Sequence, residues 1–155
     1  MSSFFFPSVT LFLSFAVTLI AWQQWRVADD KLRLDLFERR YKIYDATMRF
    51  VANIVSKATF EDADLVEFYR QTSDAVFFFR SDVVEYLDVI RDRAVKTRSL
   101  AHQFRDLPVG DYRTALVEKE SAELMWLSNQ LPLIKDVFLP YLSFDKIRRV
   151  SLFRL

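Results

Sequence analysis

The sequence predicts an all-α protein, in which an N-terminal transmembrane helix continues into a cytosolic antiparallel bundle of about four helices. Residues that make turns are rare, since Gly110 is the only glycine and the chain has four prolines. Hairpins and sheets need such residues, so long tracts without them favour helices. Apolar residues also recur every three or four positions, which is typical of helices with one buried face. Finally, residues 4–25 form an apolar run without a charge.

This run predicts a transmembrane anchor within residues 1–25. As a helix, FFFPSVTLFLSFAVTLIAWQQW would span roughly 33 Å, and the apolar core of a bilayer is roughly 30 Å thick. Trp22 and Trp25 suit the membrane–water interface. A cleaved signal peptide is the alternative, but no basic residue precedes the run. The basic residues that follow it predict an outside N-terminus and residues 26–155 in the cytosol, at the bacterial inner membrane; they are Arg26, Lys31, Arg33, Arg39 and Arg40.

The composition limits partners and chemistry. Hydrophobic residues make up 52% of the 155 residues and Phe occurs 16 times, which leaves apolar material for lipid or a partner beyond a core. The net charge of +1 gives no overall field for nucleic acid, so a nucleic-acid partner is not expected. Without cysteine, the chain has no disulfide and no thiolate metal ligand. The expected partners are membrane lipids and either a second copy or another protein.

Residues 26–58 predict one helix that leaves the membrane and joins the bundle. Six of its apolar residues alternate spacings of four and three, the heptad pattern of a packing seam. Leu36, Ile43, Phe50 and Ile54 form a neighbouring stripe, so the apolar face is wider than a two-stranded coiled coil needs. The seam is predicted to lie in the bundle or at an interface. Its members are Phe37, Tyr41, Tyr44, Met48, Val51 and Val55, and its backward continuation is Leu34, Asp30 and Val27.

The other helices follow from breaks in this pattern. Residues 58–79 predict a helix with acids near its start and an apolar end, VFFF, that should be buried. A helix capped by Ser81 follows and ends at the turn LPVGDYR, residues 107–113. A further helix, with Asp111 as its cap, reaches Pro132, and a short apolar segment comes next. The inward residues expected after Ser81 are Val83, Leu87, Ile90, Ala94, Thr97, Ala101 and Phe104.

A basic amphipathic tail, residues 144–155, follows the bundle of residues 26–143. Such a segment binds anionic lipid headgroups, at roughly 1 kcal/mol per basic residue near the surface. A C-terminal helix that closes the bundle is the alternative. The predicted lipid contacts are Lys146, Arg148, Arg149 and Arg154.

Two phrases carry a resemblance to a known family. LDLFERRYKIY, residues 34–44, follows the predicted span, and AVFFFRSDVVEYLDVI covers residues 75–90. Together with the span, they resemble a widespread family of small uncharacterised bacterial single-pass membrane proteins that carry a Leu-x-Leu-Phe-x-x-Arg-x-x-x-Tyr motif after the span. The resemblance implies a single-pass anchor and a cytosolic helical bundle, and it brings no known activity. The matching residues are Leu34, Leu36, Phe37, Arg40 and Tyr44.

A fainter resemblance concerns Arg98 and His102. The phrase RSLAH is similar to the Arg–His pair of degenerate HEPN-type bundles in small membrane accessory proteins of RNA-targeting CRISPR systems. About four to six residues usually separate a HEPN pair, whereas three separate this one. The resemblance implies a nuclease pair, since His can move a proton near neutral pH. A histidine at the bundle edge is the alternative.

No other pattern indicates catalysis, a metal or a cofactor, so we expect none of the three. A zinc site needs several ligands and a di-iron bundle needs two Glu-x-x-His motifs, which a single histidine cannot supply. The sequence favours a membrane-anchored, oligomeric interaction or assembly module. The alternative is a membrane effector in phage defence, either a pore-forming oligomer or a degenerate HEPN-like ribonuclease.

Overall fold

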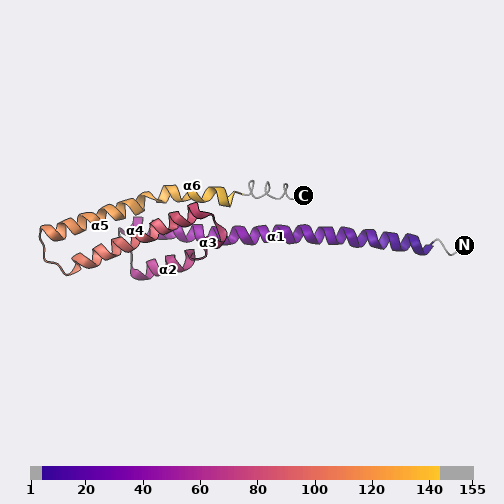
Figure 1. The fold of residues 1–155 in the computed structure, drawn as a ribbon, viewed down its shortest axis with the longest axis horizontal. Helices are drawn as coiled ribbons and strands as arrows, with labels where there is room; N and C mark the ends of the chain where they lie inside the picture. Colours follow the sequence, from indigo (N-terminus) through magenta and orange to yellow (C-terminus); the bar gives the residue numbers. More distant parts are fainter. Residues whose placement is uncertain (1–4, 144–155) are drawn as a thin grey trace. The chain divides into compact units, whose positions relative to one another are not determined.

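The computed structural model describes residues 5–143, with side chains from residue 14 onward. Within those residues it contains helices and no strand, which confirms the predicted all-α class. The helices are α1 (Phe5–Lys57), α2 (Asp62–Thr72), α3 (Ala75–Phe78), α4 (Ser81–Arg105), α5 (Asp111–Asn129) and α6 (Leu131–Leu142), which Figure 1 colours along the chain. The predicted tail, with Lys146, Arg148, Arg149 and Arg154, lies outside the described residues.

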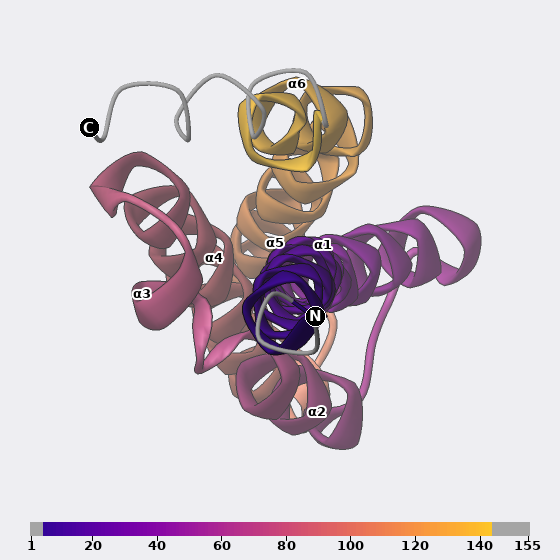
Figure 2. The same cartoon turned by 90° about the vertical axis from the view of Figure 1, so that its right-hand side faces the viewer.

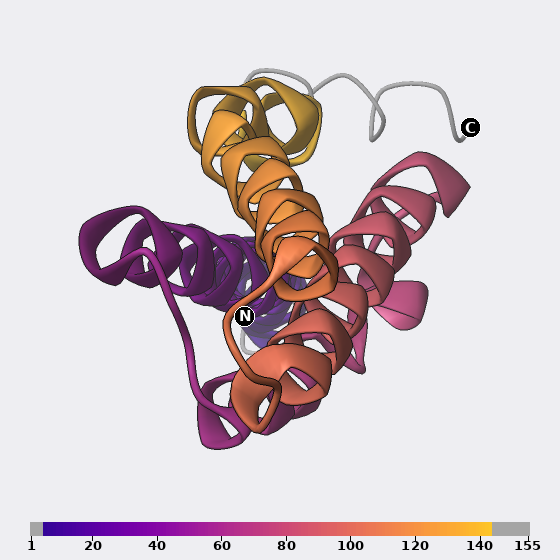
Figure 3. The same ribbon diagram turned by 90° about the vertical axis from the view of Figure 1, so that its left-hand side faces the viewer.

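The chain divides into two units, residues 1–37 and residues 38–155. α1 belongs to both, because it is one uninterrupted helix from Phe5 to Lys57. The second unit holds a bundle in which α4 and α5 form an antiparallel hairpin (Figure 1). Figures 2 and 3 look along the bundle and show α2, α4, α5 and the C-terminal part of α1 around a common interior. The predicted helical bundle is thus confirmed.

The end of α1 is a tight reversal at Ala58. This residue has a φ of 52°, in the left-handed region that usually belongs to glycine after a helix. Its N–H donates to the Ile54 carbonyl oxygen at 2.8 Å and so completes the last turn. Three residues later, the Glu61 N–H donates to the Asp64 carboxylate at 2.9 Å, which caps the start of α2.

The predicted single helix over residues 58–79 is wrong, because the chain breaks at Ser73 and Asp74 between α2 and the one-turn helix α3. The Ser73 hydroxyl donates to the Arg70 carbonyl oxygen at 3.0 Å, a local bond that competes with helix continuation. The predicted burial of VFFF also fails at Val76 and Phe77, which are 59% and 79% exposed. A single turn has one inward face, and here Ala75 and Phe79, four residues apart, occupy it.

In α4 the predicted inward residues are buried at Val83, Leu87, Ile90, Ala94 and Thr97, while Ala101 and Phe104 are half-buried. Ser81 is not the N-cap, because Arg80 takes that position and Ser81 is the first helical residue. Likewise, Gly110 precedes α5 and Asp111 is its first residue. The break after α5 falls at Gln130, so Pro132 lies in the first turn of α6, where proline is tolerated.

One apolar core joins the helices of the second unit. Its aromatic part pairs Phe79 and Phe138 edge to face, with ring centroids 5.3 Å apart. Phe50 of α1 stacks on Phe68 of α2 at 4.4 Å. The buried apolar residues of this core are Ile43, Phe50, Val51, Ile54, Phe60, Phe68, Ala75, Phe79, Val83, Leu87, Ile90, Ala94, Leu127, Ile134 and Phe138.

A polar clamp also ties α4 to α5. The Glu123 side chain is 9% exposed and accepts hydrogen bonds from Lys96 at 2.6 Å and Arg93 at 2.9 Å. The Arg93 guanidinium also lies over the Trp126 ring, 4.4 Å from its centroid. A buried carboxylate needs such partners, because removal from water disfavours its charge.

Candidate functional site

Large apolar side chains are exposed along the part of α1 between residues 14 and 25. Phe15, Val17 and Ile20 are 64%, 63% and 54% exposed. Successive residues of a helix are about 100° apart around its axis, so Val17 and Ile20 share one face, Phe15 lies on the opposite face, and Trp25, 67% exposed, lies between the two faces. The apolar surface therefore surrounds the helix and does not form a single stripe. The Thr18 hydroxyl donates to the Ser14 carbonyl oxygen at 2.8 Å, which satisfies its polar group within the helix.

No helix in the described part of the chain combines the length and apolarity that crossing a membrane requires. Residue 4 lies outside the described residues, and the side chains of residues 5–13 lie outside the described side chains. These residues make up the first part of the predicted span. The transmembrane anchor therefore stays a prediction.

An aromatic–cation pair follows the apolar stretch. The Arg26 guanidinium lies over the Trp22 ring, 4.7 Å from its centroid. Trp25 is 67% exposed. One turn further, Arg33 forms an ion pair with Asp29 at 2.7 Å. The spacing of four between Trp22 and Arg26 is a signal that the sequence reasoning missed, because residues four apart on a helix are neighbours.

The predicted seam of α1 divides between the core and the surface. Val51 is fully buried, and Tyr44 and Met48 are half-buried against the core. Tyr41 and Val55 are 47% and 46% exposed, so neither is a core residue of this chain. The inward face is instead centred on the neighbouring stripe, in which Leu36 is half-buried. The buried residues of this face are Ile43, Ala46, Thr47, Phe50 and Ile54, and Phe37 of the seam is half-buried.

Five apolar residues of α1 recur every seven positions along the sequence. In the first unit Val27 and Leu34 are 68% and 50% exposed, and in the second unit Tyr41 and Val55 are exposed while Met48 is half-buried. We call these five residues the α1 stripe. A strict seven-residue repeat drifts by about 20° per heptad on a straight helix, and coiled coils correct the drift by supercoiling. The α1 stripe thus has the period of a two-helix contact.

Among the residues that match the family motif, Arg40 has the most specific contacts. Its Nε donates to the Phe78 carbonyl oxygen at 3.0 Å, and a terminal nitrogen donates to the Tyr141 carbonyl oxygen at 3.2 Å. Burial lowers the pKa of Arg40 from its ordinary value. Tyr44 meets Phe138 edge to face at 5.6 Å. The motif positions Arg40 and Tyr44 therefore hold α1 to α3 and α6, whereas Leu34 is exposed.

The structure brings Arg98 and His102 together, and it adds Asp62. Arg98 Nε donates to the Asp62 carboxylate at 2.7 Å, and a terminal nitrogen donates to the Phe60 carbonyl oxygen at 3.1 Å. His102 Nε2 lies 3.5 Å from Arg98 and 3.8 Å from Asp62. The hydrogen bond from Arg98 lowers the pKa of Asp62. The Arg98 guanidinium already binds Asp62 at the start of α2, so Arg98 links α2 to α4.

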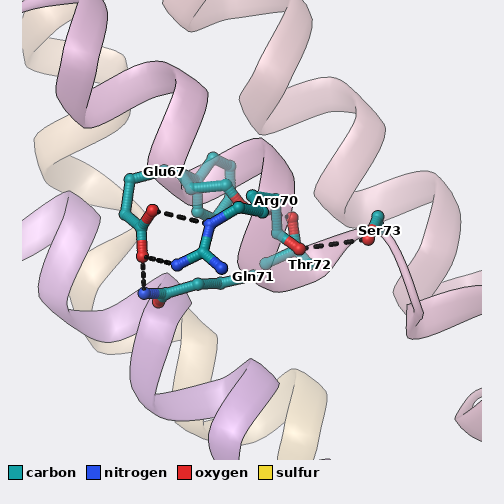
Figure 4. A network of polar contacts seen from close by, with 6 residues as sticks. Glu67, Arg70, Gln71, Thr72 and Ser73 are labelled. Carbon is teal, nitrogen blue, oxygen red and sulfur yellow. Dashed lines mark hydrogen bonds and ion pairs between the residues drawn. The ribbon is translucent and has the colours of Figure 1, made fainter.

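An open groove of about 620 Å³ runs between α1 and α2. Phe50 and Phe68 contribute to its lining from opposite helices. On the α2 side, Glu67 accepts hydrogen bonds from Arg70 and Gln71, as Figure 4 shows. These bonds lower the pKa of Glu67. The polar rim of the groove on α2 is therefore already paired within the helix.

Comparisons with protein-family models, curated proteins and solved structures give no match for this chain. The resemblance of residues 34–44 to the bacterial membrane family therefore stays a prediction. Among the described residues, no group of three or more His, Cys, Asp or Glu side chains is placed to hold a metal ion. The surfaces that remain as candidates are the α1 stripe and the apolar stretch that precedes it.

Proposed function

We propose that this protein is a membrane-anchored helical bundle that serves as an assembly module by associating with copies of itself along α1. The observation that carries the proposal is the change in exposed apolar surface along this one helix. Between residues 14 and 25 the apolar side chains face all directions, which suits lipid. From Val27 onward most of the exposed apolar residues of α1 keep the seven-residue spacing of the α1 stripe, with Leu32 as an exposed residue outside it, and this spacing suits one neighbouring helix.

The anchor is proposed to lie in the bacterial inner membrane with the N-terminus outside. The uncharged residues 4–25 and the basic residues that follow support this orientation. Two copies inserted the same way have parallel α1 helices. Identical residues of the α1 stripe then meet at the same height, as a parallel coiled coil requires. Confinement to one membrane also raises the effective concentration of the second copy.

Vesicle flotation tests the anchor. The full chain should float with phosphatidylcholine vesicles and remain bound after an alkaline carbonate wash. A deletion of residues 4–25 should stay with the soluble fraction while keeping its helical circular dichroism. Release of the full chain by carbonate would show that it does not span the bilayer and would contradict the proposal.

Cysteine cross-linking tests the contact, because the natural chain has no cysteine. Leu34→Cys, in the α1 stripe, should give a disulfide dimer on mild oxidation in vesicles. Leu32→Cys is the matched control, since Leu32 is 68% exposed but lies about 200° away around the helix. Equal yields for the two variants, or none for Leu34→Cys, would remove the α1 stripe as the contact.

The Arg98–His102 pair gives the ribonuclease alternative no added support. Its arginine is bound to Asp62 and to the Phe60 carbonyl oxygen. A phosphate would have to displace both contacts before it could bind Arg98 in the bidentate manner that arginine favours. The assembly role is preferred because it uses surfaces that are exposed in the structure.

A further inference from the structure

We propose that Arg26, held on Trp22, is a binding site for the phosphate of an anionic phospholipid headgroup. This inference rests on the proposed membrane anchor and names the lipid chemistry that the end of the anchor recognises. It is carried by the Trp22–Arg26 contact, by the pairing of the neighbouring charges and by the direction of helix side chains.

The Arg26 guanidinium contacts an aromatic ring and no described carboxylate. The Cζ atom of Arg26 lies over the Trp22 ring, 4.7 Å from its centroid. A guanidinium has five N–H donors, so Arg26 can keep this contact and still donate to two phosphate oxygens at once. Among the described residues, no carboxylate forms an ion pair with Arg26.

The acids nearest to Arg26 in sequence, Asp29 and Asp30, do not neutralise it. Asp29, three residues after Arg26, forms its ion pair with Arg33 at 2.7 Å. The charge of Asp29 is therefore already neutralised by Arg33, which follows it along the helix. Asp30 is exposed and lies four residues after Arg26, yet the guanidinium points back to Trp22 instead. Arg26 is consequently a cation that no described carboxylate pairs, and it lies closer to the apolar stretch than Lys31, which also has no such partner among the described residues.

The depth of the Arg26 guanidinium in the membrane follows from the direction of side chains on a helix. Side chains on a helix lean toward its N-terminus, so Arg26 leans toward the apolar stretch and the bilayer. Trp22 and Arg26 are four residues apart, which is about 6 Å along the helix axis. Because the Arg26 guanidinium lies over the Trp22 ring, it lies near the level of Trp22 and not at the level of its own Cα. Tryptophan favours the headgroup level, where each interfacial layer is about 5–7 Å thick. The Arg26 guanidinium thus reaches the layer that contains the lipid phosphates.

Quenching of tryptophan fluorescence by brominated lipids tests the site on the full chain in vesicles. Brominated phosphatidylglycerol and brominated phosphatidylcholine give the relative binding constant of the anionic lipid at the anchor. The wild type should prefer phosphatidylglycerol, and Arg26→Gln should lower this preference about fivefold, the factor for one basic residue near the surface. Arg33→Gln is the control and should keep the preference, because Asp29 already pairs with Arg33.

The outcomes separate this inference from the proposed anchor. Absence of quenching by either lipid would overturn the anchor itself and the site with it. Quenching with the same preference in Arg26→Gln and wild type would overturn the site alone. If the site binds a lipid phosphate, inorganic phosphate at about 20 mM should lower the preference no more than sodium chloride of equal ionic strength does. Loss of the preference in this arm, beyond the loss in sodium chloride of equal ionic strength, would assign Arg26 to soluble phosphate and overturn the lipid assignment.

Discussion

At the residue scale, Arg40 supplies hydrogen bonds to carbonyl oxygens at the C-terminal ends of α3 and α6. The last carbonyl oxygens of a helix have no N–H partner within it. Arg40 donates to two such oxygens, of Phe78 and Tyr141, and its guanidinium lies 5.7 Å from the centroid of the Tyr141 ring. The Tyr141 hydroxyl in turn donates to Asp82 at 2.6 Å, which links the same corner to α4.

Replacing Arg40 with lysine should destabilise the bundle. Lysine keeps the charge but cannot donate to both carbonyl oxygens in a fixed fork. We expect the free energy of unfolding to fall by about 2 kcal/mol, the range for lost hydrogen bonds to a charged group. Urea unfolding of the full chain in mild detergent measures it. Arg39→Lys is the control and should stay within about 0.5 kcal/mol, since Arg39 is exposed.

At Ala58, in contrast, a substitution should raise the free energy of unfolding. Its φ of 52° strains a residue that has a Cβ. Ala58→Gly should therefore raise the free energy of unfolding by about 1 kcal/mol. Ala52→Gly, at an exposed position inside α1, should lower it by about 1 kcal/mol. The same urea titration decides the matter, and a loss of stability in Ala58→Gly would contradict the assigned backbone conformation.

At the element scale, the pairing of α4 with α5 should depend on pH through Glu123. Burial acts to raise the pKa of Glu123, but the hydrogen bonds from Lys96 and Arg93 outweigh it and lower the pKa below 4.5. A carboxylate with a lowered folded-state pKa stabilises the fold above its unfolded pKa. That stabilisation is lost as the pH falls through the folded-state pKa.

The wild type should therefore lose stability below about pH 4.5, and Glu123→Gln should lose less over the same range. Thermal unfolding between about pH 3 and pH 6 measures the slope. Glu118→Gln, at an exposed position of α5, should keep the wild-type slope. Identical slopes in wild type and Glu123→Gln would show that the clamp does not contribute to acid stability.

Elements also show where sequence reasoning succeeds. The inward face of α4 was predictable because Val83, Leu87, Ile90 and Ala94 keep a regular spacing over a long helix. The same reasoning failed at Phe77, because α3 has one turn and no period can be read from four residues. Its exposure depends on how α3 is held by distant residues.

The candidate site shows the same division. The heptad period of the α1 stripe was readable from the sequence, but which members face the core was not. Val51 is buried and Val55 is exposed because α2, α4 and α6 approach α1 from particular sides. The local sequence around Glu123 contains no sign of its burial, which depends on contacts with Arg93 and Lys96, 30 and 27 residues away. Contacts between residues distant in sequence are what local patterns do not contain.

At the scale of the whole molecule, one chain combines the proposed anchor, the proposed parallel α1 contact and the bundle. Substitutions in the α1 stripe should then separate assembly from folding. Leu34→Glu with Val55→Glu places like charges in a parallel contact, while both positions are exposed in the single chain. Val66→Glu is the control, since Val66 is 66% exposed on α2 and outside the stripe.

Light scattering on the full chain in lipid nanodiscs, corrected for lipid, tests the central claim most directly. The wild type and Val66→Glu should have a mass that is a discrete multiple of the chain mass of 18.4 kDa. Leu34→Glu with Val55→Glu should give a single chain of unchanged helicity. A wild-type protein that is monomeric in nanodiscs would contradict assembly through α1.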